Sequence, residues 1–151
     1  MQTFELDIFI DCPQYKIFDH ISQPINMIGL QPLLTEIDIL EEKMENNVIQ
    51  RPFQTVETFR WLGLPIFKNR NLFIINLTKP KEELEFHVYS RSNIEIIFKY
   101  SLRESNDKRT QITQTVQFVK VNKLLEKFVV RQANQAQRAL LSNLKVRLEK
   151  K

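Results

Sequence analysis

Apolar and polar residues alternate along the first ten positions of the chain. Phe4, Leu6, Ile8 and Ile10 are separated by single residues, and Glu5 is one of the polar residues between them. A period of two is typical of a strand with one buried face. The pattern therefore predicts an opening strand that ends near residue 10.

Two short helical segments are predicted next. Pro13 suits the first turn of a helix, where its missing N–H group would have no partner in any case, and the apolar side of that helix contains Ile17, Phe18 and Ile21. Pro24 begins the second segment, which we expect to end near Gly29.

Six further strands are predicted between Leu33 and Phe118. Alternating or continuous apolar runs mark residues 37–39, 48–59, 67–77, 84–89, 94–102 and 110–119, and turn residues separate them at 45–47, 63–65, 79–81, 92–93 and 105–107. Because these connections are short, neighbouring strands should be antiparallel.

After Val119, the spacing of the apolar residues changes from two to three and four residues, which indicates one long helix. The positions that carry it are Leu125, Phe128, Val129, Gln132, Ala136, Ala139, Leu140, Asn143, Leu144 and Leu148. A helix of about 28 residues would be roughly 42 Å long. It is long enough to cross the whole sheet.

This order of elements predicts an α+β helix-grip fold, in which a curved seven-stranded antiparallel sheet, with two short helices, closes over the long C-terminal helix. A sheet curled on one helix leaves a pocket between them. The inward positions that we infer are large and apolar: Phe73, Ile75, Leu84, Phe86, Val88, Ile94, Ile96, Phe98, Val116 and Phe118. We find no repeat or linker, so residues 1–151 are expected to form a single ligand-binding domain.

Composition narrows the class of protein. The apolar fraction of 42% is enough for one core, and we find no run of about 18 apolar residues that could span a bilayer. The N-terminus shows no signal-peptide pattern, so we expect a cytoplasmic protein. Cys12 is the one cysteine, which excludes an internal disulfide and a cysteine-rich zinc site.

Charge is distributed unevenly along the chain. The formal net charge of +4 divides into −7 for residues 1–50, +3 for residues 51–100 and +8 for residues 101–151. On the final helix, Lys123, Lys127, Arg131 and Arg138 recur at helical spacing on one outer stripe. Such a stripe could meet RNA or an anionic membrane, although a solvated helix face is the simpler interpretation.

The chain resembles the START-like superfamily, also called SRPBCC, of polyketide cyclase/dehydrase and lipid-transport proteins. The resemblance rests on residues 11–19 and 22–24 after the first strand, on residues 30–33, and on the ending from residue 128 to residue 149. It implies a hydrophobic or amphipathic ligand, such as a lipid, polyketide, quinone or sterol, held between sheet and helix. It does not name the ligand.

The predicted ligand-binding residues combine the inward positions with the apolar turn between the third and fourth strands. They are Trp61, Leu64, Phe73, Ile75, Phe86, Phe98, Tyr100, Gln114, Val116, Phe118, Phe128 and Gln132. The apolar turn around Trp61 could be a lid or a membrane or partner contact, and packing against the final helix is equally open.

Polar residues that share a face with the inward apolar residues are candidates for ligand binding or catalysis. Tyr100, Gln114 and Gln132 need a partner inside, which a ligand, a water molecule or the backbone could provide. If Glu57 points inward, desolvation would raise its pKa and permit proton transfer. His87 has the parity of the solvent face.

Three functions remain open from sequence. The first is binding or carriage of an apolar or amphipathic small molecule. The second is a cyclase-type enzyme that uses Tyr100, Gln114 and Glu57. The third is an interaction module that docks on a ribosome or an anionic membrane through the basic helix. We predict no catalytic residue, metal ligand set, cofactor or specific nucleic-acid partner.

Overall fold

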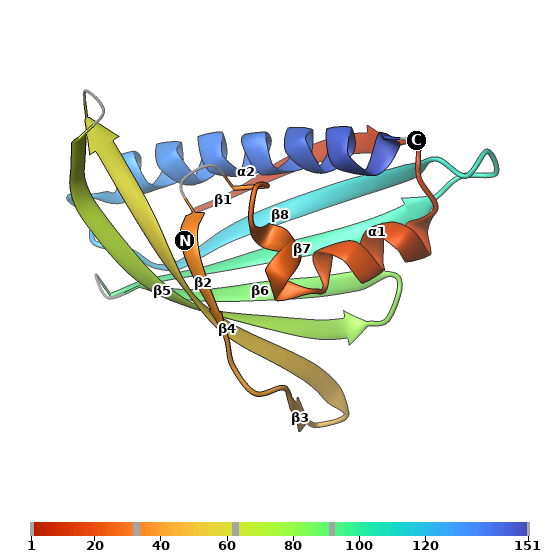
Figure 1. Ribbon diagram of the computed structural model, residues 1–151, viewed down its shortest axis with the longest axis horizontal. Helices are drawn as coiled ribbons and strands as arrows, with labels where there is room; N and C mark the ends of the chain where they lie inside the picture. Colours follow the sequence, from red (N-terminus) through yellow and green to blue (C-terminus); the bar gives the residue numbers. More distant parts are fainter. Residues whose placement is uncertain (1, 32–33, 62–63, 91–92, 151) are drawn as a thin grey trace.

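The computed structural model describes residues 2–31, 34–61, 64–90 and 93–150, and for residues 58–61 and 64–69 it describes the backbone alone. Every pair of neighbouring strands in the sheet is antiparallel, and the sheet order is β1-β8-β7-β6-β5-β4-β2, with β3 paired to β4 (Figure 1). The strands are β1 (Gln2–Ile10), β2 (Leu34–Ile39), β3 (Lys43–Glu45), β4 (Val48–Trp61), β5 (Leu64–Lys79), β6 (Glu83–Ser90), β7 (Ile94–Glu104) and β8 (Thr110–Lys120).

The sheet has eight strands, so the predicted number of seven is wrong by one. The additional strand is β3, which continues into β4 through Asn46 and Asn47, both with positive φ (52° and 65°). Asparagine tolerates this left-handed conformation, which a tight hairpin turn requires. Because all three residues of β3 are exposed, the strand has no alternating apolar pattern that would reveal it.

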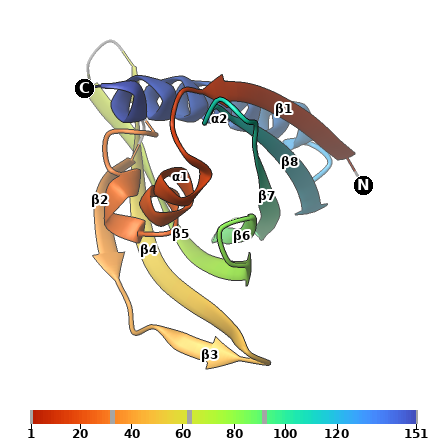
Figure 2. The same cartoon turned by 90° about the vertical axis from the view of Figure 1, so that its right-hand side faces the viewer.

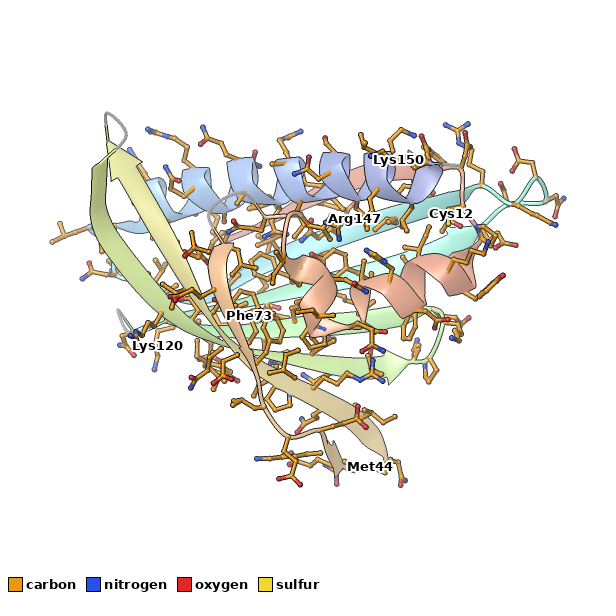
Figure 3. All side chains as sticks on the ribbon, in the orientation of Figure 1. Cys12, Met44, Phe73, Lys120, Arg147 and Lys150 are labelled. Carbon is orange, nitrogen blue, oxygen red and sulfur yellow. The ribbon has the colours of Figure 1, made fainter. Side chains whose placement is uncertain are left out.

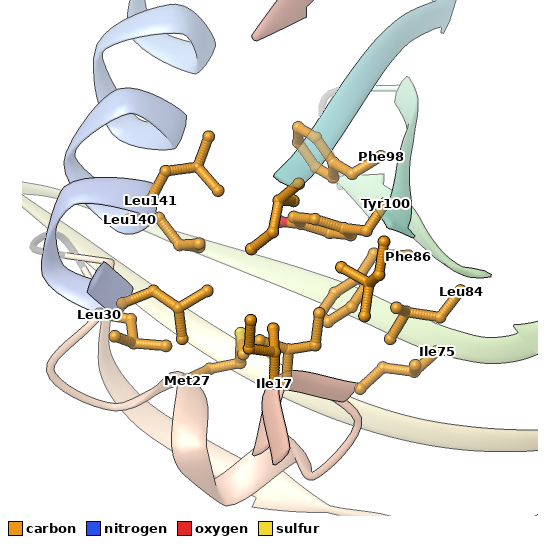
Figure 4. Packing of buried hydrophobic residues seen from close by; sticks show 14 of the residues in the cluster. Ile17, Met27, Leu30, Ile75, Leu84, Phe86, Phe98, Tyr100, Leu140 and Leu141 are labelled. Carbon is orange, nitrogen blue, oxygen red and sulfur yellow. The ribbon is translucent and has the colours of Figure 1, made fainter. Parts of the chain in front are cut away.

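The sheet curls into a half-barrel around the first helices (Figure 2). Helix α1 (Gln14–Ile21) and the 3₁₀ helix η1 (Pro24–Met27) lie at its open side, and α1 buries Ile17, Phe18 and Ile21. Figure 4 shows Ile17 and Met27 meeting apolar side chains from the strands and from the long helix. These two short segments therefore fill one end of the space that the sheet encloses.

Helix α2 (Glu126–Glu149, 24 residues) crosses the sheet along its length (Figure 1). It is slightly shorter than predicted because the residues before Glu126 form a turn. Leu140, Leu141 and Leu144 are buried, whereas Phe128 near the start of the helix is half exposed. The C-terminal half of α2 therefore contributes fully buried leucines, whereas the apolar residues Val129, Val130 and Ala133 in its N-terminal half are only partly buried against the core.

Polar contacts tie the C-terminal half of α2 to the segment around η1. The Arg147 guanidinium donates to the carbonyls of Asn26 (2.6 Å) and Ile28 (2.9 Å), and Asn143 Nδ2 donates to the Leu30 carbonyl (2.8 Å). Figure 3 shows Arg147 between α2 and this segment. These contacts hold the C-terminal half of α2 against the segment around η1.

Candidate functional site

A cavity of about 270 Å³ lies between α2 and strands β4 to β7. Most of its lining is apolar: Met27, Leu34, Phe53, Phe73, Phe86, Val88, Ile94, Ile96, Phe98, Leu125, Phe128, Val129, Ala133, Ala136 and Leu140. Its polar lining residues are Gln31, Thr55, Glu57, Asn71, Ser90, Tyr100, Gln132 and Gln137. An apolar chamber with a few convergent polar groups is the usual form of a small-molecule site.

Paired aromatic rings make up part of the cavity wall. Phe53 and Phe73 face each other across β4 and β5, with ring centroids 4.9 Å apart at an interplanar angle of 21°. Phe86 and Tyr100 meet across β6 and β7 in an edge arrangement at 5.3 Å and 64°. Because aromatic pairs prefer such geometries, this wall should keep its shape when the cavity is empty.

The structure brings six of the predicted ligand-binding residues to the cavity. They are Phe73, Phe86, Phe98, Tyr100, Phe128 and Gln132. Ile75, Val116 and Phe118 are buried in the core but do not line this space, and Phe118 packs on the Phe4 ring of β1 at 5.9 Å. Strand parity identifies inward residues correctly, but it does not say where along a strand the neighbouring helix fills the interior.

The remaining predicted residues are placed differently. The side chains of Trp61 and Leu64 lie outside the described residues, although their backbones pair at the end of the β4–β5 hairpin. Gln114 is completely buried behind the cavity wall and does not line the cavity. Its hydrogen-bond partners come from the protein.

Tyr100, Gln114 and Gln137 form a buried hydrogen-bonded trio on β7, β8 and α2. Gln137 Oε1 accepts from Gln114 Nε2 at 2.7 Å and from the Tyr100 hydroxyl at 3.2 Å, and Gln114 Nε2 also lies 3.1 Å from that hydroxyl. Burial raises the pKa of Tyr100, which keeps its hydroxyl protonated. The trio thus links sheet to helix, and the protein itself provides the partner that we expected from a ligand, a water molecule or the backbone.

Gln137 is a residue that sequence reasoning missed. It lies three residues before Leu140 and seven before Leu144, on the buried stripe of α2. A glutamine among these leucines was a detectable signal of a polar contact. Gln114 Oε1 lacks a hydrogen-bond partner among the described residues, so the trio leaves one buried acceptor unsatisfied.

A second polar group lies on the β4–β5 side of the cavity. Thr55 and Asn71 are direct cross-strand neighbours, and Asn71 Nδ2 donates to Glu57 Oε1 at 2.8 Å. Burial raises the pKa of the Glu57 carboxyl, and hydrogen bonds from Asn71 and Gln31 oppose that shift in part. Glu57 does point inward, as the sequence allowed.

The Thr55 hydroxyl has no hydrogen-bond partner in the part of the chain that the structure describes. Thr55 is 2% exposed and lines the cavity. An unpaired buried hydroxyl is costly. It is therefore the cavity group that would gain most from a bound polar atom.

The histidines lie away from this site. His87 Nε2 lies 3.0 Å from Glu85 Oε1 on the outer face of β6, and His20 Nε2 lies 3.1 Å from Arg147 Nη1. Burial and the neighbouring Arg147 cation lower the pKa of His20. Within the described ranges, no group of three His, Cys, Asp or Glu side chains could hold a metal ion.

The comparisons with known proteins find solved structures of similar fold. No protein-family model matches the sequence, and the search of curated proteins finds no match. The fold is similar to a protein from Thermus thermophilus, with a TM-score of 0.74 and 12% identity over 97% of each chain. It is also similar to a START superfamily protein from Mycobacterium smegmatis, with a TM-score of 0.70 and 12% identity over 97% of each chain.

An enzyme is also among the similar structures. The Zhui aromatase/cyclase from Streptomyces sp. R1128 has a TM-score of 0.70 and 14% identity, over 97% of this chain and 94% of that one. At these identities the likeness shows the fold alone. The predicted START-like helix-grip fold is confirmed, and the ligand is not identified by it.

Proposed function

We propose that this chain, which has the START-like helix-grip fold, binds and carries a hydrophobic or amphipathic small molecule in the cavity between the sheet and α2. The observation that carries the proposal is the cavity itself, about 270 Å³ lined mainly by apolar side chains. Unfilled space of this kind costs packing energy that a bound apolar molecule would recover. The resemblance to START-like proteins, which implies a ligand held between sheet and helix, supports this use.

The polar group on β4 and β5 supports an amphipathic ligand with a neutral polar end. Thr55 offers a hydroxyl that has no hydrogen-bond partner among the described residues, and burial raises the pKa of the Glu57 carboxyl. A carbonyl or hydroxyl on the ligand could accept from Thr55 without bringing a charge inside. A carboxylate would instead approach Glu57, which is unfavourable when both groups are ionised.

The test is extraction of freshly purified protein. Native mass spectrometry should show added mass, and organic extraction should release an apolar compound. Ala136→Leu would project a larger side chain into the cavity and should reduce the retained compound. Gln135→Leu introduces the same side chain at an exposed position of the same helix and should retain it. Equal retention by both variants would contradict cavity binding.

A cyclase-type enzyme is the second candidate function. The observation that favours it is Glu57, whose carboxyl lines the cavity and has a raised pKa, so that it could transfer a proton. If the protein is an enzyme, prolonged incubation should convert the extracted compound to a product, and Glu57→Gln should stop conversion while the compound still binds. An unchanged compound would favour carriage alone.

A further inference from the structure

Exposed apolar side chains surround the start of α2, where the cavity reaches the surface. Leu124 is 93% exposed, Phe128 54% and Leu125 43%. Leu125 and Phe128 also line the cavity, so the exposed group and the cavity are continuous. We call Leu124, Leu125 and Phe128 the apolar rim. Apolar groups exposed together at an opening mark contact with something other than water.

The backbone holds this rim in place. Asn122 Oδ1 accepts from the Leu124 amide at 2.8 Å, and the Asn122 carbonyl accepts from the Leu125 amide at 3.0 Å. The Val129 amide then donates to the Leu125 carbonyl at 2.8 Å, which starts the helical ladder. Leu124 is therefore presented to solvent by a hydrogen-bonded turn that leads directly into α2.

Basic side chains flank the apolar rim. Lys120, Lys123, Lys127 and Arg131 are exposed, and Glu126 is the one acidic residue between positions 120 and 131. Among the described residues, none of these four cations makes an ion pair. Arg131 follows Lys127 by four residues and Phe128 by three, so both cations lie next to Phe128 on the surface of the first turns of α2. Their charge is therefore free to act on a partner.

We propose that the apolar rim and its four flanking cations form a docking surface for an anionic lipid bilayer. Leucine and phenylalanine would enter the interface between head groups and acyl chains while lysine and arginine contact anionic head groups, as on interfacial amphipathic helices. An aliphatic side chain as exposed as Leu124 favours lipid over nucleic acid, which would be met mainly by charges and stacking aromatic rings.

The position of the docking surface beside the cavity also supports a role in ligand transfer. Because the rim borders the cavity, a ligand could pass between bilayer and cavity without crossing water. This transfer role rests on the proposed function, whereas docking rests on the surface alone. No helix within the described ranges is long and apolar enough to cross a membrane.

The experiment measures sedimentation of the protein with vesicles of phosphatidylcholine, with and without phosphatidylserine. The protein should bind the vesicles that contain phosphatidylserine, and binding should weaken as salt rises. Replacing Lys123, Lys127 and Arg131 with Gln should reduce binding on the order of 100-fold, because each cation near an anionic surface contributes several-fold. Leu124→Ser should also reduce binding, since it removes the inserted side chain.

Matched controls separate docking from general charge and from folding. Replacing Arg103, Lys108 and Lys150 with Gln removes the same charge from exposed positions at the end of β7, between β7 and β8, and after α2, and should leave binding nearly unchanged. The β7–β8 connection and the C-terminal end of α2 lie at the opposite end of the molecule from the start of α2 (Figure 1). Met44→Ser removes an exposed apolar residue from β3, far from the rim, and should behave likewise (Figure 3). Circular dichroism should show that every variant folds, because all of these positions are exposed.

Three outcomes would overturn the proposal: no binding to vesicles that contain phosphatidylserine, equal loss with the control variants, or binding that Leu124→Ser does not change. If the protein binds an RNA homopolymer instead, with sensitivity to the cations and none to Leu124, the surface is a polyanion site. Ala136→Leu should bind vesicles normally even though it fills the cavity. Failure of docking is thereby distinguished from failure of cavity binding.

Discussion

Two inward residues of β4, Thr55 and Glu57, differ in how well the protein satisfies their polar groups. Glu57 is hydrogen-bonded by Asn71 and Gln31 but is costly to ionise, and Thr55 is uncharged but has an unpaired hydroxyl in the part of the chain that the structure describes. Residues i and i+2 of a strand share a face, so both side chains reach the same cavity. Each requirement leads to a measurable expectation.

Glu57→Gln should change the pH dependence of stability. The pKa of the Glu57 carboxyl is raised on folding by burial, so the folded state holds the proton more tightly than the unfolded state. The wild type should therefore lose stability as the pH rises through the unfolded-state pKa, until the loss is complete above the folded-state pKa. The variant should be more stable than the wild type at neutral pH and similar to it in acid. Urea denaturation across this range measures the difference, and parallel curves would contradict a buried carboxyl.

Thr55→Val should raise the stability of the protein and weaken its binding of a ligand that carries a carbonyl group. Valine keeps the shape of threonine and removes a buried hydroxyl that has no partner among the described residues, so the free energy of unfolding should rise by roughly 1 kcal/mol. Binding of 2-acetylnaphthalene should weaken about fivefold if its carbonyl accepts from Thr55. 2-Isopropenylnaphthalene, which has a methylene in place of the carbonyl oxygen, is the matched probe and should bind both proteins alike in calorimetry.

Which of these residues point inward could be read from sequence, but their partners could not. Parity placed Tyr100 and Gln114 inside, as the structure has them, and left open whether Glu57 points inward, which it does. Their contacts depend on register between strands far apart in the chain, and on the rotation of α2, which brings Gln137 to Tyr100 and Gln114. A single sequence holds no direct information on either quantity.

At the scale of elements, β6 to β8 were predictable because each has one buried face and a continuous alternation. The short strand β3 was not, since its three residues are all exposed. The long helix was predicted from its period, yet its two halves differ in a way that the period does not reveal. Leu140 and Leu144 pack in the core, whereas Phe128, with the same periodicity, borders the cavity and solvent.

The two halves of α2 should therefore respond differently to truncation of side chains. Phe128 is 54% exposed, so Phe128→Ala should cost clearly less than a buried phenylalanine, on the order of 1 kcal/mol. Phe53→Ala is the comparison, because Phe53 is fully buried against Phe73, and its loss should cost about 3–5 kcal/mol. Chemical denaturation gives both values. A cost for Phe128→Ala as large as that for Phe53→Ala would mean that this ring is packed in the core.

At the scale of the whole molecule, the cavity follows from an asymmetry in how the sheet is closed. Helix α1, η1 and the contacts of Arg147 fill and seal one end (Figure 2). Toward the start of α2, the side chains that face strands β4 to β7 include Ala133 and Ala136, which are too small to reach across. The sequence predicted that a pocket would exist between sheet and helix, but its position depends on this difference between the two ends.

If the cavity is a binding site, its filling should govern the stability of the whole domain. A ligand that binds the folded state alone stabilises it by mass action, about 2.7 kcal/mol when its concentration is a hundred times its Kd. In a thermal melt, 2-acetylnaphthalene should therefore raise the Tm of the wild type in a concentration-dependent way.

Ala136→Leu should begin with a Tm at or above that of the ligand-free wild type, because the new side chain occupies unfilled space. Its Tm should rise much less than that of the wild type when the ligand is added. Gln135→Leu, at an exposed position of the same helix, should gain as much as the wild type. A ligand-dependent rise of equal size in all three proteins would mean that the compound binds elsewhere, and a Tm of Ala136→Leu well below the wild type would mean that this part of the interior is already filled.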